Sequence, residues 1–370
     1  MPRIHVMVVV GARPQFVKCA PLIKEILVRR REMDLSIVHS GQHYDSEMSE
    51  VFFRELMIPK PSLNLHAGSG SHAAQTATIM KRLEAPMLKL EPDVVLVPGD
   101  TNTTLAASLT AAKIGIPVAH LEAGMRSGDT TMPEEINRRL TDHCSAILLA
   151  PTKTAVRNLK KEGLGKATRL TGDTMVETLR AVMPVVQRRE RDILAGLGLQ
   201  ADNYALVTLH RPSNVDNLSR LRKIQLALHK AAKRLRVVFP VHPRTRSRLR
   251  GLKSGATSTE GGVTYMSPQG YIETMSLLRN ASCLVTDSGG MQKESFLLHV
   301  PCITLRSTTE WPETLTGKAN QLLIQPEMIH AKILTTAFDH TLKNNIRRLR
   351  NPFGDGHSSE RIANILEETF

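Results

Sequence analysis

Short apolar runs alternate along the chain with longer stretches in which apolar positions recur at helical spacing. The first segments read IHVMVVVG at 4–11, PLIKEILVRRRE at 21–32 and LSIVHSGQ at 35–42. A buried strand, an amphipathic helix and a second buried strand in succession are typical of a βαβ unit with parallel strands. The pattern therefore predicts the α/β fold class.

This alternation occurs in two series, which a polar, helix-prone segment at 185–199 separates. Further strands are expected in the first series at 93–100, 117–124 and 146–152, and in the second at 204–210, 236–243, 263–267, 283–289 and 301–306. The 370 residues also exceed the roughly 250–300 at which one hydrophobic core stops growing. We therefore expect two doubly wound, Rossmann-like domains, at 1–172 and 173–355, facing a central cleft where ligands of open α/β sheets bind.

The charge of the chain narrows the choice of partners. Lys and Arg number 49 against 35 acidic residues, and the resulting net charge of +14 attracts anions. The basic residues are scattered, however, and aromatic residues make up only 4% of the chain, so few side chains are available to stack on bases. We expect an anionic small molecule as the ligand, and no nucleic acid.

Several classes of protein are disfavoured by what the sequence lacks. The four cysteines form no CxxC pair, and neither the dinucleotide fingerprint GxGxxG nor the phosphate loop GxxxxGK[ST] occurs. These absences argue against a structural zinc site, a nicotinamide enzyme and a phosphate-loop NTPase. No stretch of 18 apolar residues follows the first strand, so we expect a cytoplasmic protein with no membrane contact, no metal and no cofactor.

Two cations follow the first predicted strand. Gly11-Ala12-Arg13-Pro14 ends that strand and opens a helix, and Lys18 lies about one turn farther along. A helix N-terminus with two cations suits a diphosphate. The alternative is a turn in which Arg13 and Lys18 are solvated charges.

Three carboxylates and an imidazole occupy strand ends or a helix start. Asp100 ends a strand, where its alternative role is to cap the next helix. Glu122 interrupts a strand exit, where a carboxylate is costly unless it is paired or used. Glu134 opens a helix, where acidic residues also favour the helix dipole. Together with His210, which follows a strand of the second domain, these groups suit proton transfer.

The segment TDSGGMQKES at 286–295 runs from a strand into a helix. The small residues Ser288, Gly289 and Gly290 let backbone N–H groups approach a phosphate, and Glu294 is placed one turn farther to bind ribose hydroxyls. The alternative is a plain strand-to-helix turn. His242 has no second metal ligand four residues on, so we expect it in a turn or a substrate contact.

Taken together, the motifs resemble the non-hydrolysing UDP-N-acetylglucosamine 2-epimerase family along the whole chain. They are GARPQFVK, PGDTNTTLAA, HLEAGMRSGD, PEEINRRLTD, TLHRPSN, PVHPRT, TDSGGMQKES and RSTTEWPET. The resemblance implies a glycosyltransferase-B type of fold in which a C-terminal helix, 356–370 here, completes the first domain while 173–355 binds UDP. It also implies a homodimer.

The resemblance further implies a reaction in two halves. UDP is eliminated from UDP-N-acetylglucosamine to leave 2-acetamidoglucal, and is re-added after reprotonation at carbon 2 to give UDP-N-acetylmannosamine. Asp100, Glu122, Glu134 and His210 match the catalytic positions of the family. The matching substrate-binding positions are Arg13, Lys18, His242, Gln269, Ser288, Gly289, Gly290, Glu294 and Arg306.

Several features depart from the family pattern, among them two single residues. Gln15 stands where the family commonly has Glu, and Trp311 stands where it commonly has Arg. The second change removes a cation near the expected cleft, and epimerases of C3-modified uronic acid sugars share this fold. The substituents of the sugar are therefore left open.

Other functions remain as alternatives. A hydrolysing 2-epimerase would release N-acetylmannosamine and UDP, and a glycosyltransferase of the same fold would need an acceptor rather than carboxylates around carbon 2. Outside the enzyme class, only the net charge of +14 favours a basic nucleic-acid-binding protein.

Overall fold

The computed structural model describes residues 3–41, 55–249 and 257–370 and divides the chain into two compact units. The first unit comprises Met1–Ala181 with Asn351–Phe370, and the second unit comprises Val182–Arg350. The sequence placed these divisions after residues 172 and 355. The first division instead falls inside one continuous helix, α7 (Thr174–Gly196).

The first unit contains a parallel sheet of seven strands among its described residues. Their order across the sheet is β3-β2-β1-β4-β5-β6-β7. The strands are β1 (Ile4–Val10), β2 (Met33–His39), β3 (Leu63–Asn64), β4 (Val94–Pro98), β5 (Val118–Leu121), β6 (Ile147–Ala150) and β7 (Thr168–Leu170).

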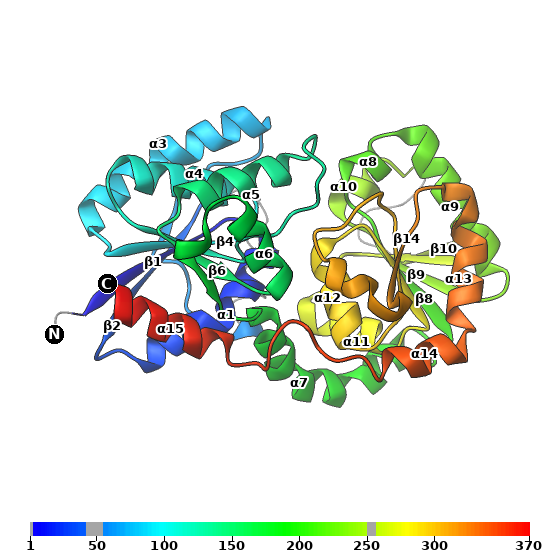
Figure 1. Cartoon of the computed structure of the whole chain (residues 1–370). Helices are drawn as coiled ribbons and strands as arrows, with labels where there is room; N and C mark the ends of the chain where they lie inside the picture. Colours follow the sequence, from blue (N-terminus) through cyan, green and yellow to red (C-terminus); the bar gives the residue numbers. More distant parts are fainter. Residues whose placement is uncertain (1–2, 42–54, 250–256) are drawn as a thin grey trace. The chain divides into compact units, whose positions relative to one another are not determined.

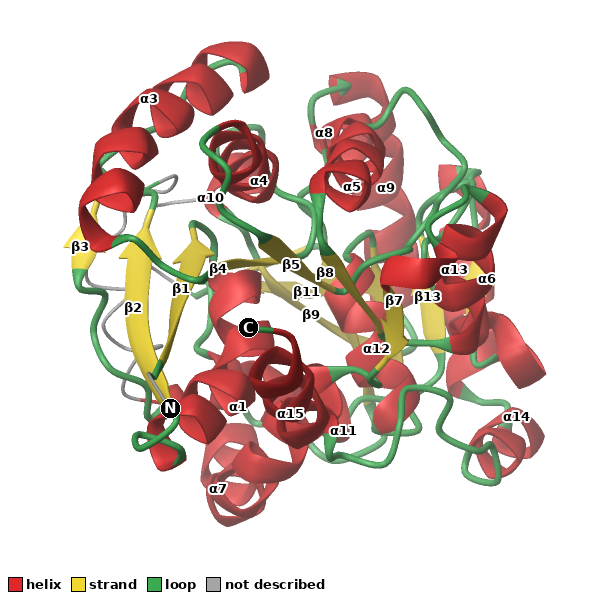
Figure 2. Ribbon diagram, turned by 60° about the vertical axis from the view of Figure 1, so that its left-hand side comes forward, coloured by secondary structure: helices red, strands yellow, loops and turns green. Residues whose placement is uncertain are grey.

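Helices cover both faces of this sheet, which explains why β4, β5 and β6 are buried at every residue. They are α1 (Arg13–Val28), α3 (His72–Leu90), α4 (Asn102–Lys113), α5 (Pro133–Cys144), α6 (Lys153–Lys161), the 3₁₀ helix η1 (Gly165–Ala167), α7 and α15 (Ser358–Thr369). Helices α3, α4 and α5 lie on one face, and α1 and α15 on the other (Figures 1 and 2). Residues of α3 and α4 complete a core with alternate residues of β1 and β4.

The second unit repeats this architecture. Among its described residues the strands lie in the order β10-β11-β9-β8-β12-β13-β14, and of these only β10 is antiparallel to its neighbour. They are β8 (Tyr204–Thr208), β9 (Arg236–Pro240), β10 (Ser258–Glu260), β11 (Val263–Met266), β12 (Cys283–Thr286), β13 (Cys302–Thr304) and β14 (Asn320–Leu322).

The helices of the second unit again lie on both faces of the sheet. They are α8 (Pro212–Val215), α9 (Leu218–Ala232), α10 (Pro243–Arg246), α11 (Tyr271–Arg279), α12 (Gly289–Leu297), η2 (Pro312–Lys318), η3 (Pro326–Met328), α13 (Ile329–Ala337) and α14 (His340–Ile346). The apolar faces of α9 and α13 form a core with β8, β9, β11, β12 and β13. Helices α11 and α12 lie on the opposite face (Figure 1).

Both sheets have the strand order of a Rossmann fold, because the chain moves outward from β1 in one direction and restarts at β4 in the other. In the second unit, β8 and β12 are the corresponding pair. This confirms the expected α/β class and the two doubly wound domains. Within the described residues, no helix is both long and apolar enough to cross a membrane.

Candidate functional site

Two of the predicted acidic residues of the first unit, Asp100 and Glu122, meet Lys18 where β1, β4 and β5 end. Strands β1 and β4 are the neighbours at which the strand order reverses, and ligands of open α/β sheets bind at this position. Lys18 comes from α1, Asp100 follows β4 and Glu122 follows β5. Residues that lie far apart in the sequence therefore meet at one edge of the sheet.

Lys18 and Glu122 form an ion pair between Nζ and Oε2 at this edge. Both side chains are largely buried, with side-chain exposures of 14% and 9%. Burial opposes the charge of Lys18, but the carboxylates of Glu122 and Asp100 raise its pKa above the ordinary value. Lys18 is thus a permanent cation at neutral pH, as a contact to a diphosphate or another anion requires.

The backbone of Glu122 adopts a left-handed conformation, with φ of 74°. A non-glycine residue in this region is uncommon and points to local constraint. The strand exit is also crowded, since a Cβ on Gly99 would lie 3.0 Å from Lys18 Nζ and 3.5 Å from Glu122 Oε2. The glycine before Asp100 therefore makes room for the Lys18–Glu122 pair.

Asp100 is held by Arg138 of α5 rather than by a helix cap. The Oδ2 atom of Asp100 lies 2.6 Å from Arg138 Nη2, and the cap of α4 is Thr101, whose hydroxyl accepts from the Thr104 N–H. Burial acts in the opposite direction, but the charges of Arg138 and Lys18 lower the pKa of Asp100. The capping alternative is therefore wrong for Asp100, which is an ionised carboxylate at neutral pH.

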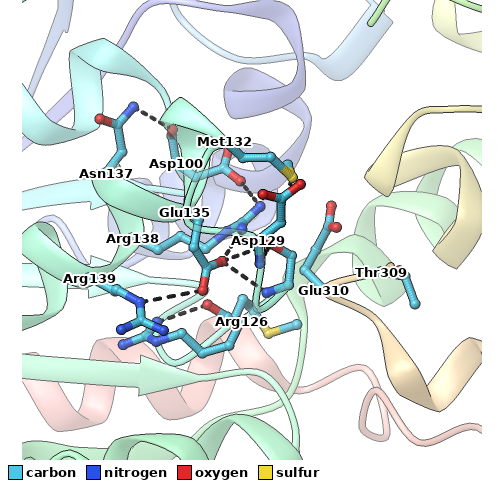
Figure 3. A network of polar contacts seen from close by, with 12 residues as sticks. Asp100, Arg126, Asp129, Met132, Glu135, Asn137, Arg138, Arg139, Thr309 and Glu310 are labelled. Atoms are coloured by element: carbon cyan, nitrogen blue, oxygen red, sulfur yellow. Dashed lines mark hydrogen bonds and ion pairs between the residues drawn. The ribbon is translucent and has the colours of Figure 1, made fainter. Parts of the chain in front are cut away.

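Arg138 also binds Glu135, so that its guanidinium joins two carboxylates (Figure 3). Glu135 is fully buried and accepts hydrogen bonds from Ser127 N–H at 2.9 Å and Ser127 Oγ at 3.0 Å. Burial raises its pKa, but the Ser127 bonds and Arg138 outweigh this effect and lower it. Glu135 is consequently a structural anion that fixes Arg138.

Glu134, the residue singled out from the sequence, behaves differently from its neighbour. It lies in the first turn of α5 and is partly exposed. Within the described part of the chain its side chain forms no hydrogen bond or ion pair. It is therefore a carboxylate that is available for a ligand, while Glu135 and Asp100 are held by protein groups.

A fully buried pair, His120 and Asp142, holds the loop that carries Glu122 in place. His120 Nδ1 lies 2.7 Å from Asp142 Oδ1, and its Nε2 lies 2.8 Å from the Gly99 carbonyl oxygen. Asp142 also accepts from the Gly124 N–H at 3.1 Å and pairs with Arg126 at 2.7 Å. These contacts connect the exits of β4 and β5, and they were not predicted from the sequence.

The remaining predicted cation of this unit is only partly described. Arg13 begins α1, as the sequence predicted, with Ala12 in extended conformation before it. The side chain of Arg13 lies outside the described residues. Its expected contact with a diphosphate stays a prediction.

In the second unit, an aspartate that the sequence did not single out organises the exits of β8 and β12. The buried Asp287 accepts from the backbone N–H groups of His210 (3.1 Å) and Arg211 (3.0 Å) and from Asn214 Nδ2 (3.1 Å). Its Oδ1 also lies 3.3 Å from His210 Nδ1. Asp287 thereby orients His210, whose side chain remains 42% exposed.

His242 lies beside His210 at this edge. The two rings are 5.5 Å apart between centroids. His242 also caps the short helix α10, since its Nδ1 accepts from the Arg244 N–H at 3.2 Å. The sequence expected a turn or a substrate contact here, and the structure supplies the turn.

The segment at 286–295 forms a strand followed by a capped helix. Ser288 is the N-cap of α12, and its hydroxyl accepts from the Met291 N–H at 3.5 Å. A Cβ on Gly289 would lie 2.2 Å from Glu310 Oε1, whereas a Cβ on Gly290 would have only Ser288 Oγ nearby, at 3.9 Å. A side chain at Gly289 would therefore have to displace the Glu310 carboxylate, and Gly290 leaves the helix start open.

The other predicted substrate contacts of this unit are partly engaged within the protein. Arg306 pairs with Glu310, with Nη1 and Oε2 2.7 Å apart, and Glu294 is buried on α12. Gln269 is half-buried and donates to the Ser267 carbonyl at 2.7 Å. Nucleotide binding by these three residues stays a prediction.

Comparison with known proteins shows which family this chain is similar to. A sequence profile described as UDP-N-acetylglucosamine 2-epimerase matches residues 25–367. The chain belongs to this epimerase family. A Methanococcus maripaludis relative named UDP-N-acetylglucosamine 2-epimerase homolog is 43% identical over 98% of this chain and 99% of its own length.

Two further family members show the range of named substrates. The UDP-2,3-diacetamido-2,3-dideoxy-D-glucuronate 2-epimerase of Pseudomonas aeruginosa is 40% identical over 98% of this chain and 99% of its own. The crystal structure of Methanocaldococcus jannaschii UDP-GlcNAc 2-epimerase in complex with UDP-GlcNAc and UDP has a TM-score of 0.88 at 40% identity, covering 99% of this chain and 100% of that one. Equal identity to epimerases with different named sugars leaves the sugar of this family member open.

Proposed function

We propose that this protein is a non-hydrolysing UDP-N-acetylglucosamine 2-epimerase, which converts its substrate into UDP-N-acetylmannosamine. The observation that carries the proposal is the cluster at the β1–β4 reversal, where Lys18 pairs with Glu122 and Asp100 pairs with Arg138. Ionised carboxylates beside fixed cations suit proton removal next to a leaving anion. Membership of the epimerase family supports the same reaction.

In the first half of the reaction, a base removes the proton on carbon 2 of the sugar. The electron pair of that bond forms the double bond between carbons 1 and 2, and the bond from carbon 1 to UDP breaks with its electrons on the UDP oxygen. We assign the base role to Glu122, because its partner Lys18 favours the ionised carboxylate. Lys18 also lies where a cation stabilises the departing diphosphate.

In the second half, carbon 2 takes a proton on its opposite face and UDP adds back to carbon 1. A single group on one side cannot perform both transfers, so a second acid is required. Asp100 is a poor proton donor at neutral pH because its pKa is lowered. Glu134 and His210 are the better candidates, since the first has no protein partner in the described chain and the second is exposed and oriented by Asp287.

The second unit would hold the nucleotide in this scheme. The open start of α12, at Ser288 and Gly290, offers backbone N–H groups to a phosphate. Glu294 on the same helix is the group assigned to ribose hydroxyls. UDP must stay bound after its elimination until it is added back. This distinguishes the reaction from hydrolysis, in which water would replace UDP at carbon 1.

The proposal is tested by proton NMR of the protein with UDP-N-acetylglucosamine in heavy water. We expect exchange of the carbon 2 proton for deuterium and the anomeric signal of intact UDP-N-acetylmannosamine. Release of free N-acetylmannosamine would show a hydrolysing enzyme instead. Absence of any exchange would contradict the assignment of this substrate.

A C3-modified uronic acid sugar is the second candidate substrate. The 40% identity to the Pseudomonas aeruginosa diacetamido-glucuronate epimerase favours it, as does Trp311 at a position where the resemblance leads us to expect a cation. The same NMR experiment with UDP-2,3-diacetamido-2,3-dideoxy-D-glucuronate decides between them. Faster exchange with that sugar would reassign the substrate while keeping the reaction.

We also propose a homodimer, which is supported by the resemblance to the family. Light scattering should then give a mass of twice the 40.9 kDa of the chain. A mass of one chain at the concentration used for activity would contradict it.

A further inference from the structure

The side chain of Gln15 links the two strand exits that meet at the site of the first unit. It is 1% exposed. Its Oε1 accepts from the backbone N–H groups of Gly11 at 2.8 Å and Ala12 at 3.0 Å. Its Nε2 donates to the Pro98 carbonyl at 2.8 Å and to Thr104 Oγ1 at 3.0 Å. One side chain therefore joins the turn before α1 to the turn before α4.

These two turns carry groups that the proposed reaction uses. Lys18 lies about one helical turn after Gln15 in α1, and Asp100 lies two residues after Pro98. The two segments are already close, as the 3.0 Å separation between a Cβ on Gly99 and Lys18 Nζ shows. A change in the spacing of the turns would therefore move Lys18 relative to Asp100.

The hydrogen-bond pattern around Gln15 is completed by a primary amide, whereas the Glu that the family commonly has at this position would complete it only when protonated. Two backbone N–H groups need an acceptor, while the Pro98 carbonyl needs a donor. The Thr104 hydroxyl already gives its proton to that same carbonyl, at 2.7 Å, so it accepts from Gln15. A carboxylate in this place would set one of its oxygens against the Pro98 oxygen, and burial would favour its protonated form.

We propose that Gln15 is a positioning residue, which fixes the spacing between the Lys18–Glu122 pair and Asp100 through a clamp that does not titrate. The proposal rests on the proposed function, because the epimerase reaction is what requires that spacing. Gln15 itself has no exposed surface with which to contact a substrate. Its effect on the reaction is therefore exerted through the two turns.

The test is the variant Gln15→Glu, compared with wild type across the pH range. When protonated, the new carboxyl can donate to Pro98 and accept from Gly11 and Ala12; when ionised, it cannot donate. Its folded-state pKa should therefore exceed the unfolded value of about 4.3. Stability relative to wild type should be retained below about pH 4 and lost progressively as the pH rises through the folded-state pKa.

Activity should follow the protonation of the folded state. We expect kcat of Gln15→Glu within about threefold of wild type near pH 6 and lower by between about twofold and about tenfold near pH 9, since buried glutamates reach pKa values of about 8–9. The dissociation constant of UDP should change less than kcat, since among the proposed UDP contacts the clamp positions only Lys18, and the proposed nucleotide contacts lie in the second unit. Gln15→Met, which removes donor and acceptor alike, serves as control and should lose activity equally at all pH values.

The possible outcomes distinguish a failure of the Gln15 proposal from a failure of the proposed epimerase function. Parallel melting profiles for wild type and Gln15→Glu across pH would refute the clamp. If the melting temperature of Gln15→Glu falls as the pH rises while its kcat stays at the wild-type level, Gln15 has only a structural role and the positioning proposal is overturned. The melting experiment needs no activity, so a failure of the proposed function would leave its result intact.

Discussion

The two units of this protein share a strand order but differ in charge. The first unit has 24 Lys and Arg against 23 Asp and Glu, a net charge of +1, whereas the second has 25 against 12, a net charge of +13. The positive charge of the chain is therefore almost entirely a property of the second unit. Two units with the same strand order can thus carry very different net charges.

The groups at the two strand-order reversals differ in the same way. In the first unit, carboxylates are held by cations, as in the pairs Lys18–Glu122 and Asp100–Arg138. In the second, the aspartate at the reversal, Asp287, accepts hydrogen bonds mainly from backbone N–H groups and Asn214. We therefore propose that the first unit supplies the carboxylates for proton transfer, with His210 of the second unit as a further candidate acid, and that the second unit supplies most of the anion binding. Mutation tests this division.

The largest effect is expected from Glu122→Gln. Removing the proposed base should lower kcat by about a thousandfold, within the range for general acid–base catalysis, while UDP binding changes by less than about threefold. Turnover in deuterium exchange and UDP titration by calorimetry measure the two quantities. Glu25→Gln, at an ion pair on the outer part of α1, is the control; an equal loss of UDP affinity in Glu122→Gln would refute the division of roles.

Arg138→Met should have the next largest effect, and on stability. It would leave the buried Glu135 with only the more distant Arg139 as a cation, at a cost of about 3 kcal/mol in the free energy of unfolding, or roughly 6–12 °C in melting temperature. Arg139→Met is the matched control, since Arg139 is half-exposed and lies 3.5 Å from the same carboxylate. A similar loss in both variants would contradict the importance of Arg138.

The two carboxylates that Arg138 binds also predict how the stability of the protein changes at low pH. Asp100 and Glu135 have lowered pKa values in the folded protein, so they stabilise it above the unfolded value of about 4 and this contribution is lost as the pH falls further. The Arg138→Met variant should lose less stability on acidification than wild type. Denaturation curves between neutral pH and about pH 3 measure the difference.

Ser288→Ala should have a smaller effect, confined to binding. It removes the cap of α12, which is worth about 1 kcal/mol, and a hydroxyl at the proposed phosphate site. We expect UDP affinity to fall about tenfold, while bound substrate still exchanges its carbon 2 proton. Ser247→Ala, at an exposed turn of the same unit, is the control and should bind UDP like wild type.

The smallest effect is expected from salt. Raising the ionic strength from about 0.05 to 0.5 M screens charges beyond a few ångströms, so KM for the UDP-sugar should rise a few fold. The kcat value should change little, because the pairs of the first unit are buried. A constant KM would show that the +13 of the second unit plays no part in attracting substrate.

The sequence predicted the buried strands and the residues that end them, because a long apolar run bounded by Gly or Asp is a local signal. It did not predict β3, β7, β10 and β14, which are edge strands of two or three residues and too short to show a period. It also missed Arg138 and Asp287. A charged residue within a polar helix, or next to a turn, looks solvated until the fold brings its partners to it.

The observed division between the units, after Ala181, was also not predicted. The prediction followed the polar residues around 172. The chain instead passes from one unit to the other inside the continuous helix α7, where the sequence pattern has no break. The roles of individual residues were even less accessible. Glu134 and Glu135 are adjacent in the sequence, and only the fold distinguishes the buried Glu135 from the available Glu134.

The return of the chain to the first unit has a consequence for its synthesis. Helix α15 packs on α1, where Arg29 contacts Asn364 at 2.6 Å and Glu367 at 3.0 Å. Residues 351–370 leave the ribosome after the whole of the second unit. The first unit therefore acquires its last helix only after the second unit has been made, and the face of α1 that α15 covers stays uncovered on the nascent chain until residues 358–369 have emerged.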